Sequence, residues 1–199
     1  MQGTVYGGIK MLKLRKCSHK DLEKYYSLFE VDFDSEELLP KLSIHRAMLK
    51  GEQELLAMYD EESGLDVACA LVCTKSLYGY VLLKYFSVFP WYRDRGFGVE
   101  AMRLINKRYA DKQGIIAEIT EFEDDYPNHI KKLFKFFARF GYVEIKSDYR
   151  IGGTTAHVFV KPIKGTHEIE PVYHRIISEY YSRCLNPFAM DSMIDIRPV

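Results

Sequence analysis

A basic segment with two glycines, in the middle of the chain, is where residue types and spacing point most directly to chemistry. An apolar stretch ending at Val88 leads into Arg93-Asp94-Arg95-Gly96-Phe97-Gly98, and a helical pattern follows at once. The first turn of a helix leaves backbone N–H groups unpaired at the positive end of its dipole, and glycines let a phosphate approach the main chain. Arg93 and Arg95 add guanidinium groups, which suit phosphate geometry. The segment predicts an anion site, with a surface turn before a helix as the alternative.

A dinucleotide is one phosphate-containing ligand to consider for this segment. Gly96 to Ala101 has the pattern G-x-G-x-x-A, and Glu118 follows about 20 residues later. A dinucleotide-binding fold, however, places its first glycine almost directly after its first parallel strand. Here residues 89–95 intervene and several predicted strands come earlier, so the dinucleotide interpretation is weak. The G-x-x-x-x-G-K-[ST] nucleotide loop is absent from the sequence.

The periodicity of apolar residues predicts the elements that position the segment. In chain order they are a strand at Leu12–Leu14, helices at Leu22–Phe33 and Leu38–Leu49, strands at Glu54–Tyr59, Val67–Thr74 and Tyr80–Val88, a helix near Val99–Tyr109, a strand at Ile115–Ile119, a helix at Asn128–Phe140 and strands at Tyr142–Ile145 and Ala156–Val160. Beyond Pro162 an amphipathic pattern predicts a helix at Ile169–Cys184, as core docking or as a lid or dimer element, and Met193–Ile196 could add a strand. This order predicts a mixed α/β domain.

The composition excludes several kinds of partner. The 199 residues include 28 Lys and Arg and 28 Asp and Glu, so the formal net charge is zero. A neutral chain has no global attraction for nucleic acid or an anionic membrane, and no apolar stretch approaches the roughly 20 residues of a membrane helix. The four cysteines form no C-x-x-C pair, and Cys69 and Cys73 lie in an apolar run. We therefore expect no nucleic acid, no membrane and no metal, and, without a signal-peptide pattern, a cytoplasmic protein.

Two short motifs resemble those of a known family. Arg93-x-x-Gly96-x-Gly98 resembles the R/Q-x-x-G-x-G/A motif of the GNAT superfamily of N-acetyltransferases, and residues 136–142 resemble its F-Y-x-x-x-G-F/Y signature. The spacing and the element order agree, and the resemblance covers roughly residues 9–160. It implies a GNAT-like α/β (α+β) fold, a mainly antiparallel mixed sheet flanked by helices. It also implies an acyl-CoA-binding domain at 9–162, with a C-terminal helix and tail at 163–199 packed on that domain.

The resemblance implies acetyl-CoA as co-substrate and an amine as acceptor. The pyrophosphate would lie on the backbone of the segment, and the pantetheine arm would lie along the strand that ends near Val88. The implied cofactor-binding residues are Ser87, Val88, Arg93, Asp94, Arg95, Gly96, Phe97, Gly98 and Val99. A main-chain N–H near Val88 would polarise the thioester carbonyl while a neutral amine attacks it. The acceptor would be a small-molecule amine or a peptide or protein amine, and the protein a monomer or homodimer.

The catalytic side chains follow less directly. Glu118 and Glu121 could deprotonate an ammonium, although a salt bridge or a solvated strand end would also explain them. Phe137 stands where many GNAT members have a proton-donating tyrosine, so water, a displaced tyrosine such as Tyr126, or the sulfur itself would handle the protons. Lys84 stands where some members have an acidic base. The alternative function is therefore a catalytically weak or inactive CoA-binding regulatory module. Trp91, just before the basic segment, is expected to be a packing anchor.

Overall fold

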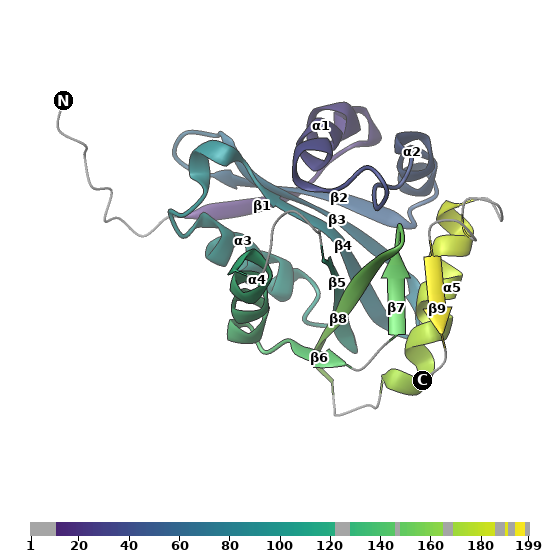
Figure 1. The fold of residues 1–199 in the computed structure, drawn as a ribbon. Coiled ribbons are helices and arrows are strands. Elements are labelled where there is room, and N and C mark those ends of the chain that lie inside the picture. The colour runs from purple at the N-terminus through teal and green to yellow at the C-terminus, as the bar shows by residue number, and fades with distance from the viewer. Residues whose placement is uncertain are drawn as a thin grey trace.

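The protein is a strongly twisted mixed sheet with helices on both faces (Figure 1). The computed structural model describes residues 11–121, 128–145, 148–164, 169–185, 190 and 194–197. Within this part of the chain the strands are β1 (Leu12–Lys16), β2 (Gln53–Asp60), β3 (Asp66–Leu77), β4 (Tyr80–Val88), β5 (Gly114–Thr120), β6 (Val143–Ile145), β7 (Asp148–Ile151), β8 (Thr154–Pro162) and β9 (Ile194–Arg197). Their order across the sheet is β1-β2-β3-β4-β5-β8-β7-β9, and β6 also pairs with β8.

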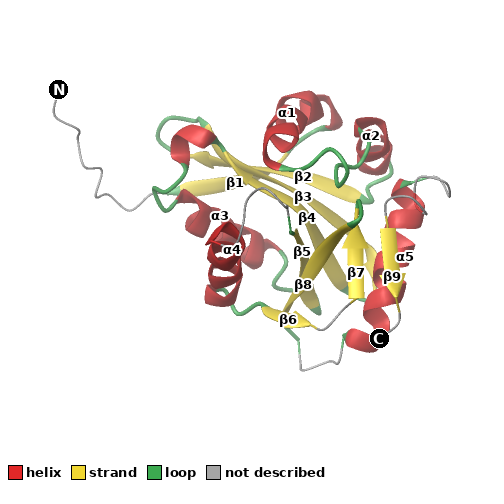
Figure 2. Cartoon of the chain, in the orientation of Figure 1, coloured by secondary structure: helices red, strands yellow, loops and turns green. Residues whose placement is uncertain are grey.

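The helices divide between the two faces of the sheet (Figure 2). The helices are α1 (Leu22–Asp32), α2 (Lys41–Leu49), α3 (Phe97–Arg108), α4 (Asn128–Arg139) and α5 (Glu170–Cys184), with single 3-10 turns at η1 (His19–Asp21) and η2 (Pro90–Tyr92). Residues of α1, α2 and α5 pack in one hydrophobic cluster, and residues of α3 and α4 pack in the other. Because strand side chains alternate between faces, Leu55 and Ala57 enter the first cluster while Leu56 and Met58 enter the second.

The sheet opens between its two central strands. β4 and β5 are parallel, and residues Tyr80–Leu83 of β4 pair with residues Gly114–Ala117 of β5. Beyond these pairs β4 continues to Val88 and β5 continues to Thr120. Within these described strands, the backbone edges beyond Leu83 and Ala117 therefore face each other unpaired. We call this gap the β4–β5 opening. It lies at the carboxyl ends of both strands, directly before the basic segment.

A β-bulge coincides with the start of this opening. Leu71 of β3 pairs with Tyr85, but the next residue, Val72, pairs with Leu83, so Lys84 is an extra residue in β4. A bulge re-aims side chains and often lies near functional sites. Here it lets Lys84 and Tyr85 both face the α1, α2 and α5 side of the sheet, since the ammonium of Lys84 lies 5.4 Å from the centre of the Tyr85 ring.

The predicted fold class is confirmed, with two differences in detail. The helix predicted from Leu38 begins at Lys41, because Pro40 takes the N-cap position, and residues 35–37 form a turn instead. The sequence analysis also missed β7, which is only four residues long. Gly152 and Gly153, both with positive φ, turn β7 back into β8.

Candidate functional site

The basic segment forms the N-terminus of α3 at the mouth of the β4–β5 opening. Gly96 is the N-cap residue and has the left-handed conformation, with φ of 80°. A side chain added there would meet no atom within 4 Å, so the backbone is approachable from that side. Phe97 is buried, with its ring 5.3 Å from the Tyr92 ring, and anchors the first turn. A rigid helix N-terminus with an open face is a suitable anion site.

The arginine side chains of the segment form hydrogen bonds that hold the loop in place. Arg93 donates from Nε to the Val88 carbonyl at 2.9 Å and from Nη2 to Asp32 Oδ1 at 2.5 Å. Arg95 donates from Nη1 to the Trp91 carbonyl at 3.1 Å. Arg93 therefore ties the loop to the ends of β4 and α1. Phosphate contacts from this loop would come mainly from backbone amides.

Three residues in or beside the segment differ from simple expectation. The Val99 N–H, expected to contact phosphate, donates to the Gly96 carbonyl at 3.2 Å. Asp94 is a non-glycine residue with positive φ, 56°, so the turn it makes before Gly96 is strained. Trp91 is 80% exposed rather than packed in the core, so the expectation of a packing anchor is wrong. It lies in η2, on the surface beside the loop.

The unpaired end of β4 supplies the next part of the site. Ser87 is buried and its Oγ has no hydrogen-bond partner. Val88 faces the other side, toward α3, since a Cβ added at Gly98 would lie 3.4 Å from Val88 Cγ2. Next to them Phe86 stacks on Phe136 of α4, with ring centres 6.1 Å apart, and forms an apolar wall on that side. The end of β4 thus offers backbone groups, apart from the Val88 carbonyl that Arg93 binds, between an apolar and a polar side.

A buried group of charges lies where the opening begins. We call Lys84, Glu118 and Tyr181 the charged cluster. Lys84 Nζ lies 2.6 Å from Tyr181 Oη and 3.3 Å from Glu118 Oε2, and Tyr181 Oη donates to the same Glu118 oxygen at 2.9 Å. Both charged side chains are only 2% exposed. Burial, and then the Glu118 charge, raise the pKa of Tyr181 well above its usual value, so its hydroxyl keeps its proton.

Glu37 lies on the same side of the sheet, in the connection from α1 to α2. It is 6% exposed, and its Oε2 accepts a hydrogen bond from Thr120 Oγ1 at 2.5 Å. Its other oxygen, Oε1, is buried without a partner. Burial raises the pKa of Glu37, against the opposing effects of the Lys84 ammonium and the Thr120 hydrogen bond. Its backbone carbonyl accepts from the Tyr85 hydroxyl at 3.0 Å.

The structure separates the two glutamates predicted as bases. Glu118 contacts α5 on one face, where Tyr173 also donates to its Oε1 at 3.5 Å. Glu121 lies after β5 and contacts His157 Nε2 at 2.7 Å, and the His157 ring packs on Phe134 of α4, on the opposite face. Their catalytic roles stay predictions. Tyr126, the predicted proton donor, lies outside the described residues. Phe137 is buried, and its ring stacks on Phe159 5.7 Å away.

Sequence reasoning missed Glu37 and Tyr181 as parts of this site. Glu37 directly precedes the helix predicted from Leu38, and the overlooked signal was Pro40, which disfavours helical backbone at the residue before it. Lys84 is a lone charge in an otherwise apolar strand, and such a charge requires a buried partner. That partner set could not be read from the sequence, because Tyr181 comes from a helix about 100 residues later.

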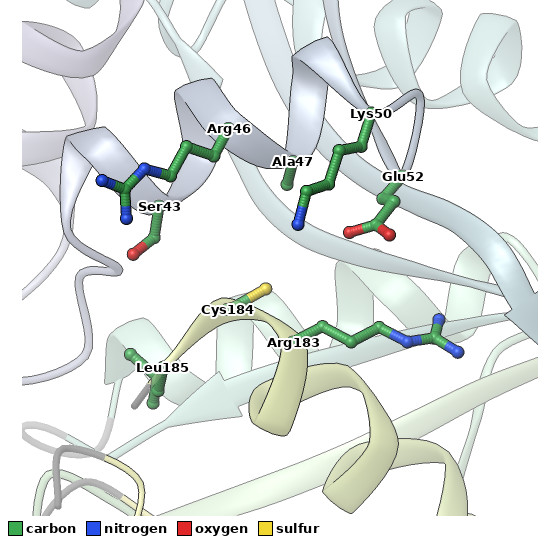
Figure 3. A pocket seen from close by; sticks show the side chains of 8 residues that line it. All are labelled: Ser43, Arg46, Ala47, Lys50, Glu52, Arg183, Cys184 and Leu185. Carbon is green, nitrogen blue, oxygen red and sulfur yellow. The ribbon is translucent and has the colours of Figure 1, made fainter. Parts of the chain in front are cut away.

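A separate hollow of about 310 Å³ lies between α2 and the end of α5 (Figure 3). Its charged lining residues are Arg46, Lys50, Glu52 and Arg183, and Lys50 is directed into the hollow. The three cations stand at the C-terminal ends of α2 and α5, where they balance the helix dipoles. Glu52 already binds Lys75 at 2.6 Å. The hollow borders the start of β2, away from the end of β4, and so is distinct from the opening.

The described part of the chain has neither a metal-binding cluster nor a membrane-spanning helix. Among these residues, no three His, Cys, Asp or Glu side chains are grouped so that they could hold a metal ion. None of the described helices combines the length and apolar character needed to cross a membrane. The four cysteines are buried and free, as expected for Cys69 and Cys73.

This architecture is similar to that of several solved structures, although the sequence comparisons find no match. No protein-family model and no curated protein sequence matches the chain. Among solved structures, a "Putative acetyltransferase from GNAT family" of Bacteroides thetaiotaomicron has a TM-score of 0.68 at 16% identity, over 85% of this chain and 96% of that one. Arabidopsis thaliana NAA60 with a bisubstrate analogue has a TM-score of 0.59 at 14% identity, over 78% and 100%. The ribosomal-protein-S18-alanine N-acetyltransferase of Escherichia coli has a TM-score of 0.57 at 13% identity, over 79% and 97%. The chain therefore has the fold of the GNAT-family N-acetyltransferases, as its two sequence motifs predict.

Proposed function

We propose that the chain is an acetyl-CoA-dependent N-acetyltransferase that acts on an amine. The observation that carries this proposal is the coincidence of three features at one place. The β4–β5 opening exposes unpaired strand edges, the N-terminus of α3 lies at its mouth, and buried ionisable groups lie where it begins. A purely structural sheet would have little use for an unpaired edge at its centre.

The described residues fit acetyl-CoA in three parts. The amides around Gly96 and Gly98 suit a pyrophosphate, because they lie at the positive end of α3 and the backbone is open at Gly96. The unpaired edge of β4 from Lys84 to Val88 suits the two amides of the pantetheine arm, which can hydrogen-bond like a neighbouring strand. One fold neighbour, NAA60, has been solved with acetyl-CoA. This supports acetyl-CoA as the co-substrate here.

The reaction is the direct attack of a neutral amine on the thioester carbonyl. A bond forms between the amine nitrogen and the acetyl carbon, and the bond from that carbon to sulfur breaks. An ammonium acceptor first loses one proton to a base, and a second N–H proton leaves with the sulfur as the free thiol. The protein mainly aligns the two substrates, and a backbone N–H near Val88 stabilises the developing oxyanion.

The acceptor belongs to the amines, either small molecules or the amino groups of peptides and proteins. Two neighbours are consistent with this range, since one is named for ribosomal-protein alanine and another is the spermidine acetyltransferase SpeG. The charges around Glu37 indicate a narrower class of acceptor.

Release of free thiol from acetyl-CoA over a panel of primary amines tests the proposed activity. We expect amine-dependent release with at least one member, together with mass-spectrometric detection of the acetylated amine. Binding of acetyl-CoA without release over the whole panel would favour the regulatory-module alternative. Absence of both would contradict the proposed function altogether.

A further inference from the structure

Glu37 bridges the two sides of the β4–β5 opening. Its backbone carbonyl is bound by Tyr85 of β4, and its carboxylate is bound by Thr120, the last residue of β5. The short connection that carries Glu37 therefore lies over the opening, beyond the last paired residues Leu83 and Ala117. Any acceptor that reaches a thioester in the opening from this face passes close to Glu37.

The carboxylate of Glu37 is incompletely satisfied. An ionised carboxylate can accept about four hydrogen bonds, but Glu37 has only the Thr120 hydroxyl and the backbone of Asp34 as hydrogen-bond partners, and Oε1 is buried with none. A buried oxygen in that state destabilises the fold unless a ligand completes it. The nearby Ser87 Oγ, on the same face of β4 as Tyr85, is also buried without a partner.

The charges around Glu37 leave an excess of one carboxylate. From β4 it faces the Lys84 ammonium and from β5 it faces Glu118. Lys84 and Glu118 already pair with each other in the charged cluster, so their charges offset. A cation that enters here would be balanced by Glu37. An anion would meet two carboxylates and a lysine that is already engaged.

We infer that Glu37 binds the ammonium group of the acceptor and removes its proton, and that the acceptor is a cationic amine with no carboxylate beside the amino group. This rests on the proposed acetyl transfer and names its base and its substrate class. The ammonium gives one proton to Glu37 Oε1, the neutral nitrogen attacks the acetyl carbon, and the bond from that carbon to sulfur breaks. A second N–H proton leaves with the sulfur as the free thiol, and the third stays on the amide nitrogen. Glu37 then returns its proton to water as the product leaves.

Glu37 suits this role better than the glutamates of β5. Glu118 has partners on both oxygens, the Oε2 with Lys84 and Tyr181 and the Oε1 with Tyr173. Glu121 is on the opposite face and is bound to His157. The raised pKa of Glu37 also brings its basicity closer to that needed to accept a proton from an ammonium near neutral pH.

Matched acceptors and matched variants test this inference. Tyramine is compared with tyrosine, and agmatine with arginine, because each pair differs by the carboxylate beside the amino group. The variant is Glu37→Gln, which keeps the shape and the Thr120 contact, and the control is Glu36→Gln, at an adjacent exposed position. Thiol release gives kcat/KM for each acceptor, and calorimetry gives the affinity for acetyl-CoA.

We expect the decarboxylated member of each pair to have a kcat/KM at least about tenfold higher, since a like-charge contact of about 1.4 kcal/mol corresponds to that factor. Glu37→Gln should lower kcat/KM about 100-fold with unchanged acetyl-CoA affinity, and should remove the acidic limb of the pH–rate profile. Glu36→Gln should match the wild type. Equal kcat/KM in Glu37→Gln and wild type would overturn the inference while the proposed function stands, and a preference for the amino acids would also overturn it.

A binding measurement decides the case in which no acceptor of the four is acetylated. Tyramine at millimolar concentration should then raise the melting temperature of the wild type and of Glu36→Gln, but not that of Glu37→Gln. The same rise in all three proteins, or in none, would overturn the inference. Loss of acetyl-CoA binding by the wild type would instead contradict the proposed function.

Discussion

Two buried carboxylates on the α1 side of the protein, Asp66 and Glu37, are satisfied very differently. Asp66 Oδ2 accepts hydrogen bonds from Arg15, Lys24 and Tyr25, while Oδ1 has no hydrogen bond but forms an ion pair with Arg15 Nη1 at 2.7 Å. Burial alone would raise the pKa of Asp66, but hydrogen bonds from these three side chains lower it to about 2. Glu37 has one side-chain partner, and burial raises its pKa.

The difference indicates which carboxylate serves the fold and which serves a ligand. Asp66 begins β3 and joins β1, α1 and β3 through contacts with three side chains, two of them cationic. The Glu37 carboxylate is held by Thr120 beside the β4–β5 opening, but its Oε1 has no hydrogen-bond partner. Proteins keep such groups where function needs them and lose some stability in return. The two residues should therefore respond to neutralisation with opposite signs.

Neutralising Asp66 should have the largest effect on stability. We expect Asp66→Asn to lower the free energy of unfolding at pH 7 by roughly 1–3 kcal/mol, because charge-assisted hydrogen bonds from two cations are lost. Asp66 has a lowered pKa, so its contribution is present above the unfolded pKa of about 4 and is lost as pH falls toward 2. Urea unfolding at pH 7 and pH 3 measures this, with the exposed Asp111→Asn as control. An equal loss at both pH values would contradict the account of Asp66.

Neutralising Glu37 should have a smaller effect of opposite sign. The pKa of Glu37 is raised in the folded state, so its ionisation lowers stability as pH rises through that pKa. Glu37→Gln should therefore be more stable than the wild type at pH 8, by about 0.5–2 kcal/mol, and the gain should shrink toward pH 4. Urea unfolding across this range measures it. A loss of stability at pH 8 as large as that of Asp66→Asn would make Glu37 a structural residue like Asp66.

The fold was largely predictable from the sequence because its periodic segments are long. Nine-residue β4 and twelve-residue α3 and α4 carry clear apolar patterns, and Pro90 and Gly141 mark ends of elements. The four-residue β7 has too short a pattern to be recognised. Its pairing with β8 is a local hairpin, but its pairing with β9 joins segments that lie far apart in the sequence.

The candidate site was predictable only where one continuous segment builds it. The loop from Arg93 to Gly98 carries its own signal in glycines, arginines and the following helix. The surroundings of Glu118 do not, because Lys84 comes from a bulge in β4 and Tyr181 from α5. The hydrogen bonds from Arg93 to Asp32 and to the Val88 carbonyl were also not predictable from the sequence. Such pairings depend on side-chain reach in three dimensions.

Titration of acetyl-CoA into the protein, with two glycine variants, tests the central claim most directly. The wild type should bind, as read by calorimetry and by the fluorescence of Trp91, the single tryptophan, which is exposed beside the loop. Gly98→Glu should abolish binding through bulk and negative charge at the phosphate position. Gly98→Ala should fold, because its Cβ lies at an acceptable 3.4 Å from Val88, and should bind more weakly than the wild type. Absence of binding by the wild type at millimolar acetyl-CoA, or unchanged affinity in folded Gly98→Glu, would contradict the account.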